Sequence, residues 1–388
     1  MKKILIAMTS LHNGGAERSL VNLLQELPPD RYELDLLLFK NEGLFLNQIP
    51  AWVNKIDPPA ELKLLYSPVK KAGKLAVYKL TADLISRLHT KNYREKRAYR
   101  WENYYSKKIP SLAGEYDTAV AYMSEDIMAF IDRKVKAKRK IVFVHSDYRS
   151  NKFPKEFDEP HFANMDAMVT ISQTCVDILK EVFPQFSDKI VLLENITSSR
   201  AVRQRAEEFK PEGYEDGAGN LLSIGRLVPT KNFTMAVDAA ALLDRRGVKF
   251  KWRIIGTGEQ HEKLQKQIES LDLSDKVSLL GAKENPYPYL SNSDVMIQSS
   301  LFEGKSIVLD EAKILAVPIV ATEYPTVRDQ VLEGKEGLIV PITPEGIADG
   351  IEKLLKNEDL RLGIKKYLSS HEYGNTEELK KYMTLFEG

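Results

Sequence analysis

The sequence predicts an α/β protein built from two Rossmann-like, doubly wound parallel-sheet domains that face each other across a cleft. Three observations predict this fold. Short apolar runs alternate with helix-length amphipathic segments, the alternation stops near the middle and then restarts, and 388 residues suffice for two domains of ordinary size. Sites in such folds lie at the carboxyl ends of the strands.

The apolar runs predict six strands in each half of the chain. In the first half they cover residues 3–8, 33–39, 118–123, 141–145, 168–172 and 190–193, and in the second half 221–224, 252–255, 277–280, 295–298, 318–322 and 338–340. Helix-length segments lie between most of them, for example 232–246 and 259–271.

Two stretches interrupt this regularity. Residues 62–110 form a basic, aromatic-rich insertion without a clear strand, and residues 196–219 are polar and lack strand periodicity, as expected of a linker. We therefore expect one domain over residues 1–200 and a second over 201–371, with a C-terminal helix in 372–388 that packs back on the first.

Composition and charge exclude several classes of protein. The 43% of hydrophobic and 29% of charged residues are typical of a soluble globular protein, and no apolar run is long enough to cross a bilayer. The single cysteine, Cys175, excludes an internal disulfide and a cysteine cluster for zinc, and it favours the cytoplasm. The net charge of +1 is the sum of +6 over residues 1–200 and −5 over residues 201–388. The positive charge is concentrated in residues 61–110, whose net charge is +9.

The first strand is followed by the turn His12-Asn13-Gly14-Gly15 and then by a predicted helix. Glycines at a strand-to-helix turn let the backbone approach a ligand, and a helix N-terminus favours an anion. The turn lacks the full G-x-G-x-x-G spacing of a dinucleotide fingerprint, so a simple tight turn is the alternative.

In the second half, two turns follow predicted strands. The segment 223–233 places Arg226 and Lys231 beside a helix start, where two cations suit a diphosphate. The next strand ends in Gly256-Thr257-Gly258, again before a helix. Each turn taken alone is also compatible with surface cations or with an ordinary turn.

The segment 299–320 carries two glutamates eight positions apart. Glu303 precedes a helix expected over residues 306–315, near the amides of Gly304, Lys305 and Ser306, and Glu311 lies about one and a half turns into that helix. Two carboxylates that accept from sugar hydroxyls, together with free amides for a phosphate, fit a nucleotide-sugar. A charged helix start is the alternative.

These motifs, in this order, resemble the GT-B glycosyltransferases of family 4 along essentially the whole chain. The resemblance implies that Arg226 and Lys231 bind the donor diphosphate, that Glu311 holds the ribose and that Glu303 holds the transferred sugar. The further donor-binding positions that it implies are Gly14, Gly15, Gly256, Gly258, Gly304, Lys305, Ser306 and Ile307. His145, which ends a predicted strand, would lie near the transferred sugar.

The chain departs from the family pattern in places. Lys305 stands where a small residue or proline is usual, Val317 replaces a glycine before the next strand, and Ile196 replaces the glycine after Asn195. The Lys305 change either alters donor-sugar selection or adds a cation at the phosphate, and we assign Asn195 no role.

By this resemblance the protein is a retaining hexosyltransferase without a metal or other cofactor. Its donor would be a UDP-sugar, with GDP as the alternative base, and its acceptor a lipid-linked or surface-polysaccharide glycan of a bacterium. The leaving phosphate oxygen would help to deprotonate the acceptor. An epimerase-like GT-B enzyme and a non-catalytic sugar-nucleotide-binding subunit are the alternatives.

The resemblance also implies that residues 1–200 bind the acceptor and that residues 201–371 bind the donor. Residues 87–110 interleave Arg and Lys with five aromatic side chains, a pattern that suits an anionic membrane surface. The alternative is a basic helix whose aromatics pack inward. We expect a cytoplasmic protein, peripheral on the inner face of the membrane through 62–110, and no nucleic-acid partner.

Overall fold

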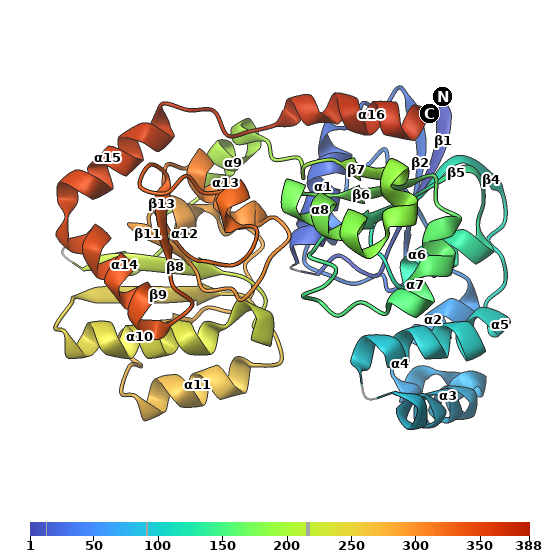
Figure 1. The fold of residues 1–388 in the computed structure, drawn as a ribbon, viewed down its shortest axis with the longest axis horizontal. Coiled ribbons are helices and arrows are strands. Elements are labelled where there is room, and N and C mark those ends of the chain that lie inside the picture. Colours follow the sequence, from blue (N-terminus) through green and yellow to red (C-terminus); the bar gives the residue numbers. More distant parts are fainter. Residues whose placement is uncertain (13, 91, 215–217) are drawn as a thin grey trace. The chain divides into compact units, whose positions relative to one another are not determined.

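The computed structural model describes residues 1–12, 14–90, 92–214 and 218–388, which divide into two compact units. The first unit comprises residues 1–12, 16–195 and 377–388, and the second is formed mainly by residues 196–376. Each unit has a parallel sheet with helices packed around it (Figure 1). Both therefore have the predicted Rossmann-like, doubly wound architecture.

The sheet of the first unit has seven strands in the order β3-β2-β1-β4-β5-β6-β7. Their bounds are β1 Lys2–Met8, β2 Tyr32–Leu38, β3 Asn54–Ile56, β4 Glu115–Ala121, β5 Lys136–Val144, β6 Ala167–Thr170 and β7 Ile190–Leu192. Residues 4–8 of β1 are continuously apolar and buried, as expected of a strand whose sheet has helices on both faces.

The sheet of the second unit has six strands in the order β10-β9-β8-β11-β12-β13. They are β8 Gly219–Ile224, β9 Phe250–Ile255, β10 Val277–Leu279, β11 Val295–Gln298, β12 Ile319–Thr322 and β13 Gly337–Val340. All twelve predicted strands are thus confirmed. The additional strand, β3, was missed because Asn54 and Lys55 are exposed and polar at the sheet edge.

The helices of the two units have the following bounds. In the first unit they are α1 Gly15–Glu26, α2 Ala60–Tyr66, α3 Ala76–His89, α4 Tyr93–Arg100, α5 Ser106–Lys108, α6 Asp126–Lys134, α7 Lys155–Ala163, α8 Gln173–Val182 and α16 Leu379–Glu387. In the second unit they are α9 Ser199–Ala206, α10 Phe233–Arg245, α11 His261–Ser270, α12 Tyr287–Ser291, α13 Ile307–Ile314, α14 Pro344–Lys356 and α15 Glu358–Ser369. No helix among the described residues has the length and hydropathy needed to cross a membrane.

The insertion at 62–110 consists mainly of helices and helical turns joined by short irregular segments, and residue 91 lies outside the described ranges. Its aromatic residues Trp101 and Tyr105, in a π-helical turn, are buried in the hydrophobic core of the first unit. Arg94 pairs with Glu125 at 2.7 Å, and Arg97 pairs with Asp126 at 2.7 Å. Part of the basic and aromatic pattern that suggested a membrane surface therefore fixes the insertion to its own unit.

The segment 196–219 contains a helix rather than only a linker. Helix α9 packs against α12 and α13 of the second unit, and the division between the units falls between Asn195 and Ile196. Residues 215–217 of this segment lie outside the described ranges. The C-terminal helix α16 belongs to the first unit, where the Tyr382 hydroxyl donates to the Glu194 carbonyl and the Thr118 hydroxyl to the Phe386 carbonyl.

Candidate functional site

The strand order of the second sheet reverses between β8 and β11, because β9 and β10 continue on one side of β8 and β12 and β13 on the other. At such a switch point the loops that leave adjacent parallel strands diverge and open a ligand site at their carboxyl ends. Lys231 follows β8 and Glu303 follows β11. The two loops that the sequence singled out therefore meet at the switch point.

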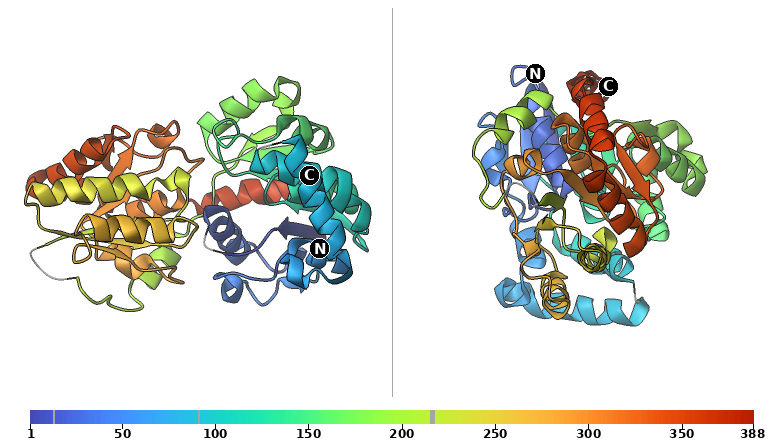
Figure 2. Two further views of the ribbon diagram at one scale, coloured as in Figure 1. Left: turned by 90° about the horizontal axis from the view of Figure 1, so that it is seen from below. Right: turned by 90° about the vertical axis from the view of Figure 1, so that its left-hand side faces the viewer.

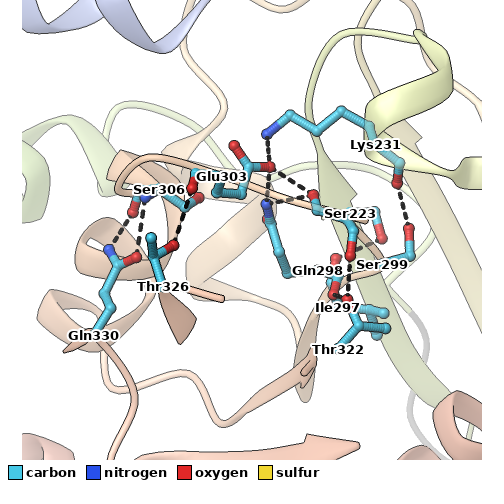
Figure 3. Close-up of polar contacts among 11 residues, drawn as sticks. Ser223, Lys231, Ile297, Gln298, Ser299, Glu303, Ser306, Thr322, Thr326 and Gln330 are labelled. Carbon is cyan, nitrogen blue, oxygen red and sulfur yellow. Dashed lines mark hydrogen bonds and ion pairs between the residues drawn. The ribbon is translucent and has the colours of Figure 1, made fainter. Parts of the chain in front are cut away.

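Glu303 is held by three donors that converge on one of its oxygens, Oε1 (Figure 3). The Lys231 ammonium donates at 2.6 Å, the Gln298 side-chain amide at 2.7 Å and the Ser300 hydroxyl at 2.5 Å. None of the three reaches Oε2. Both partners of the ion pair are largely buried, so the geometry fixes the carboxylate while its second oxygen is left for a ligand hydroxyl.

The Gly256-Thr257-Gly258 turn packs directly on the loop that carries Arg226. A Cβ at Gly256 would lie 1.8 Å from the Gly225 carbonyl oxygen, and one at Gly258 would lie 2.3 Å from that of Leu227. Only glycine therefore fits at either position. The packing of this loop accounts for both glycines without a ligand, and the Arg226 side chain is exposed.

The N-terminus of α13 lies directly after Glu303, along Gly304, Lys305 and Ser306. The Gln330 side chain clamps Ser306, because its Oε1 accepts from the Ser306 N–H at 3.0 Å and its amide donates to the Ser306 carbonyl. The Ser306 hydroxyl is buried without a hydrogen-bond partner among the described residues. The helix start is thus fixed in place, although the Ser306 amide that was expected to bind the donor already has an acceptor.

Asp310, in the first turn of α13, forms ion pairs with two lysines. Lys313 lies 3.3 Å from Asp310 Oδ1, and Lys305 lies 4.0 Å from Oδ2. The unusual Lys305 is therefore turned toward the helix, and all three side chains are largely buried.

Glu311 is buried one turn into α13 and accepts a hydrogen bond of 2.7 Å from the Tyr287 hydroxyl of α12. The helix begins at Ile307, one residue later than expected, so Glu311 lies about one turn into it rather than one and a half. A ribose that binds Glu311 would have to share this carboxylate with Tyr287.

In the first unit, the strand order reverses between β1 and β4, and β5 lies next to β4. The turn after β1 contains buried Gly14 and exposed Gly15, while Asn13 lies outside the described residues. His145 follows β5 and its ring stacks 5.5 Å from that of Phe143. The glycine turn and His145 therefore both follow the carboxyl ends of strands of this sheet.

The imidazole of His145 is in a low-dielectric environment. Burial lowers the pKa of His145 to about 4, although the Tyr122 backbone and the Asn195 side chain lie close enough to oppose the shift. Neither ring nitrogen has a partner with hydrogen-bond geometry in the described part of the chain. The ring is therefore neutral over the physiological pH range.

Sequence reasoning missed the side chains that hold the predicted residues. Gln298 and Ser300 lie five and three residues before Glu303, and Tyr287 comes from the helix before β11. Asn195, to which no role was assigned, accepts from the Ser19 hydroxyl at 2.6 Å. The polar run Gln298-Ser299-Ser300 at the end of an apolar strand was the available signal for the first two.

The chain is similar to known glycosyltransferases. Residues 204–370 match the family described as Glycosyl transferases group 1. An uncharacterised glycosyltransferase of Methanocaldococcus jannaschii is 25% identical over 258 residues, which cover 58% of this chain and 64% of that protein. A Campylobacter jejuni N-acetylgalactosamine-N,N'-diacetylbacillosaminyl-diphospho-undecaprenol 4-alpha-N-acetylgalactosaminyltransferase is 32% identical over 147 residues, 37% of this chain and 40% of that protein.

The chain thus spans less than two thirds of the length of these curated relatives. Among solved structures, a TarM variant of S. aureus in complex with fondaparinux, alpha-GlcNAc-glycerol and UDP superposes with a TM-score of 0.71. That comparison covers 100% of both chains at 16% sequence identity, and it shows a shared fold.

Proposed function

We propose that the protein is a retaining hexosyltransferase that uses a nucleotide-sugar donor, because residues 204–370 match the group 1 glycosyl transferases and the chain has the GT-B fold. One observation carries the proposal: Lys231 and Glu303 meet at the switch point of the second sheet, with Glu303 fixed through Oε1. This arrangement offers a cation for a phosphate and a carboxylate oxygen for a sugar hydroxyl.

The donor diphosphate would bind between Arg226, Lys231 and the start of α13. Two cations and the positive end of a helix dipole stabilise the charge that develops on the leaving phosphate. The amides of Gly304, Lys305 and Ile307, together with Ser306, would contact sugar and phosphate, and Glu311 would hold the ribose. The Gly256-Gly258 turn would support Arg226 beside the diphosphate.

The transfer breaks the bond between the anomeric carbon and the diphosphate oxygen and forms a bond from the same face to an acceptor hydroxyl. The acceptor proton passes to the leaving phosphate oxygen, so the residues need only position the substrates and stabilise charge. We propose that no metal is needed, since Arg226 and Lys231 supply the cations. His145, which follows β5, and Gly14 and Gly15, in the turn after β1, would contact the sugar and phosphate end.

The nature of the donor and acceptor is supported by the similar proteins. The TarM complex contains UDP and an alpha-linked GlcNAc, and the Campylobacter relative is named for an alpha linkage to a diphospho-undecaprenol-linked sugar. We propose a UDP-hexose donor, with GDP as the second choice of base. The acceptor would be a lipid-linked or surface-polysaccharide glycan held by residues 1–200.

Calorimetry of the purified chain with UDP-, GDP-, ADP- and dTDP-sugars tests the donor site. One sugar nucleotide should bind clearly and should lose its affinity in Glu311→Ala, while Glu345→Ala, which alters an exposed glutamate on α14, should bind as the wild type does. Unchanged affinity in Glu311→Ala would refute the donor site.

The reaction is tested by adding candidate acceptors to the donor so identified. A glycosylated product with the donor's anomeric configuration supports the proposal, whereas an inverted configuration refutes retention. Release of nucleotide and free sugar without a product favours an epimerase-like enzyme, and donor binding without any turnover favours a non-catalytic subunit.

A further inference from the structure

Helix α3 exposes an apolar face to solvent. Val77, Leu80, Leu84 and Leu88, here called the α3 stripe, are between 53% and 79% exposed. Their spacing of three and four residues places them on one side of the helix. Ala82 and Ser86 on the opposite side are buried, so the stripe is not the face that attaches α3 to its unit.

Single exposed apolar side chains are common, but one valine and three leucines on one helix face form a patch that monomeric soluble proteins seldom leave uncovered. The helix lies at the periphery of the first unit, beside α4 (Figure 2, right, light blue). Its fourteen residues span about 21 Å. This geometry suits a helix that lies flat on a surface with one face immersed.

The surroundings of the stripe are cationic. Lys70, Lys71 and Lys74, just before α3, are exposed, and residues 61–110 carry a net charge of +9. The acidic group on the helix, Asp83, is already paired with Arg87 at 2.6 Å and Arg100 at 2.7 Å. An occupant of the stripe must therefore be apolar where it meets the leucines and negatively charged around them.

We propose that the α3 stripe docks the protein on an anionic lipid bilayer, with the leucines inserted at the level of the acyl chains and the lysines at the headgroups. A second copy of the chain fits less well, because two stripes placed face to face would bring together two strongly cationic regions. The suggestion that the α3 stripe brings the enzyme to a lipid-linked acceptor rests on the proposed function. The binding of the stripe to lipid does not depend on that function.

The buried aromatics of the insertion do not belong to the docking surface. Trp101 and Tyr105 are buried and Arg94 and Arg97 are paired within the unit, so residues 94–105 serve as the support of α3. This assigns membrane contact to a face that the pattern of aromatic and basic residues in 87–110 does not identify.

The test is flotation of the full chain with vesicles of phosphatidylcholine alone and with vesicles that also contain phosphatidylglycerol. The wild type should float only with the anionic vesicles, and its binding should weaken as salt is added. The double variant Leu84→Glu/Leu88→Glu should bind at least about tenfold more weakly, because two apolar contacts are lost. Leu362→Glu, which alters an exposed leucine on α15 of the other unit, is the matched control and should bind normally.

The triple variant Lys70→Glu/Lys71→Glu/Lys74→Glu separates charge from insertion, and it should abolish the preference for anionic vesicles. Flotation of the wild type with neither vesicle, or equal flotation of Leu84→Glu/Leu88→Glu and wild type, would overturn the proposal. A self-association seen by sedimentation velocity and removed by Leu84→Glu/Leu88→Glu, without vesicle binding, would assign the stripe to a second copy.

Two cross-checks keep this proposal distinct from the proposed function. Donor binding by calorimetry should be unchanged in Leu84→Glu/Leu88→Glu, because the stripe lies in the first unit and the donor residues lie mainly in the second. Conversely, Glu303→Gln should float like the wild type even though its donor site is damaged, and a loss of flotation in that variant would contradict the assignment to α3.

Discussion

The Lys231 ammonium lies 2.6 Å from Oε1 of Glu303, and the same oxygen accepts from Gln298 and Ser300. The pair is largely shielded from solvent, so the interaction between the two charges is stronger than it would be on an open surface. A diphosphate that arrives at this site competes with Glu303 for the ammonium. The site is therefore organised before the donor binds, and its charge balance depends on both residues.

The cations of the proposed diphosphate site should be needed for turnover. We expect Arg226→Ala and Lys231→Ala each to lower kcat by a factor on the order of 10², which is the scale of losing one donor that stabilises developing charge. Steady-state kinetics with the sugar nucleotide found by calorimetry measures this. Lys249→Ala, an exposed lysine before β9, serves as the control, and near-normal kcat in either site variant would contradict the diphosphate assignment.

Ser300 should act as a positioning residue for Glu303. Ser300→Ala removes one of three donors to Oε1, so we expect kcat to fall by about tenfold, in line with the loss of a hydrogen bond to a charged group. KM should change much less, because Ser300 itself is not proposed to touch the donor. Ser291→Ala, whose hydroxyl donates to the Pro288 carbonyl, is the matched control. A tenfold increase in KM with an unchanged kcat would show that Ser300 binds substrate instead.

The sequence alone predicted the two sheets and the residues at their switch points because both depend on local patterns. Apolar runs of four to seven residues mark buried strands, and the residues that follow them lie at the ligand-binding edge. This is why Lys231 and Glu303 could be singled out before the structure, whereas His145 was named through the resemblance to the glycosyltransferase family. Strand β3 escaped this reasoning because only Ile56 of its three residues is apolar.

The contacts that support the site depend on tertiary structure and could not be predicted in the same way. Tyr287 reaches Glu311 from α12, and Gln330 reaches Ser306 from the segment after β12. Neither has a sequence spacing that relates it to its partner. The basic, aromatic pattern of 87–110 was ambiguous for a similar reason, since only burial distinguishes a membrane face from an inward-facing one.

His145 should not titrate in the range where the enzyme is assayed. Burial lowers its pKa to about 4, so the imidazole stays neutral from pH 5 upward and cannot produce an inflection near 6.5. We expect the profile of kcat/KM against pH to be identical in shape for the wild type and His145→Gln between pH 5 and 8. An inflection near 6.5 that disappears in the variant would show that the ring is hydrated and protonated in that range.

His161 should make stability fall at alkaline pH. It lies between the Asp132 carboxylate at 2.6 Å and the Glu102 carboxylate at 2.8 Å, on α7, α6 and the π-helical turn. Burial by itself would lower its pKa, but these two hydrogen bonds outweigh burial and raise the pKa of His161 to about 8. The protonated ring therefore joins the insertion to the sheet-covering helices.

The sign of the effect follows from linkage. Since the folded pKa exceeds the unfolded value of about 6.5, the stabilisation is complete below pH 6.5 and is lost as the pH rises through 8. The shift corresponds to about 2 kcal/mol of unfolding free energy. Burial raises the pKa of Asp158 to about 7, so ionisation of this carboxyl also lowers the unfolding free energy as the pH rises. That decrease is largely over by pH 7.5, and the decrease above pH 7.5 therefore reports on His161.

Urea denaturation at a series of pH values measures this contribution. The unfolding free energy of the wild type should decrease between pH 7.5 and 9, and His161→Gln should be less stable at pH 6 but should lose little more over that interval. Asp158→Asn should keep the alkaline decrease, because it leaves His161 with both carboxylates. If His161→Gln shows the same alkaline decrease as the wild type, the ion pairs with Asp132 and Glu102 do not hold a proton on the ring, and the insertion is joined to its unit by apolar packing and the arginine pairs alone.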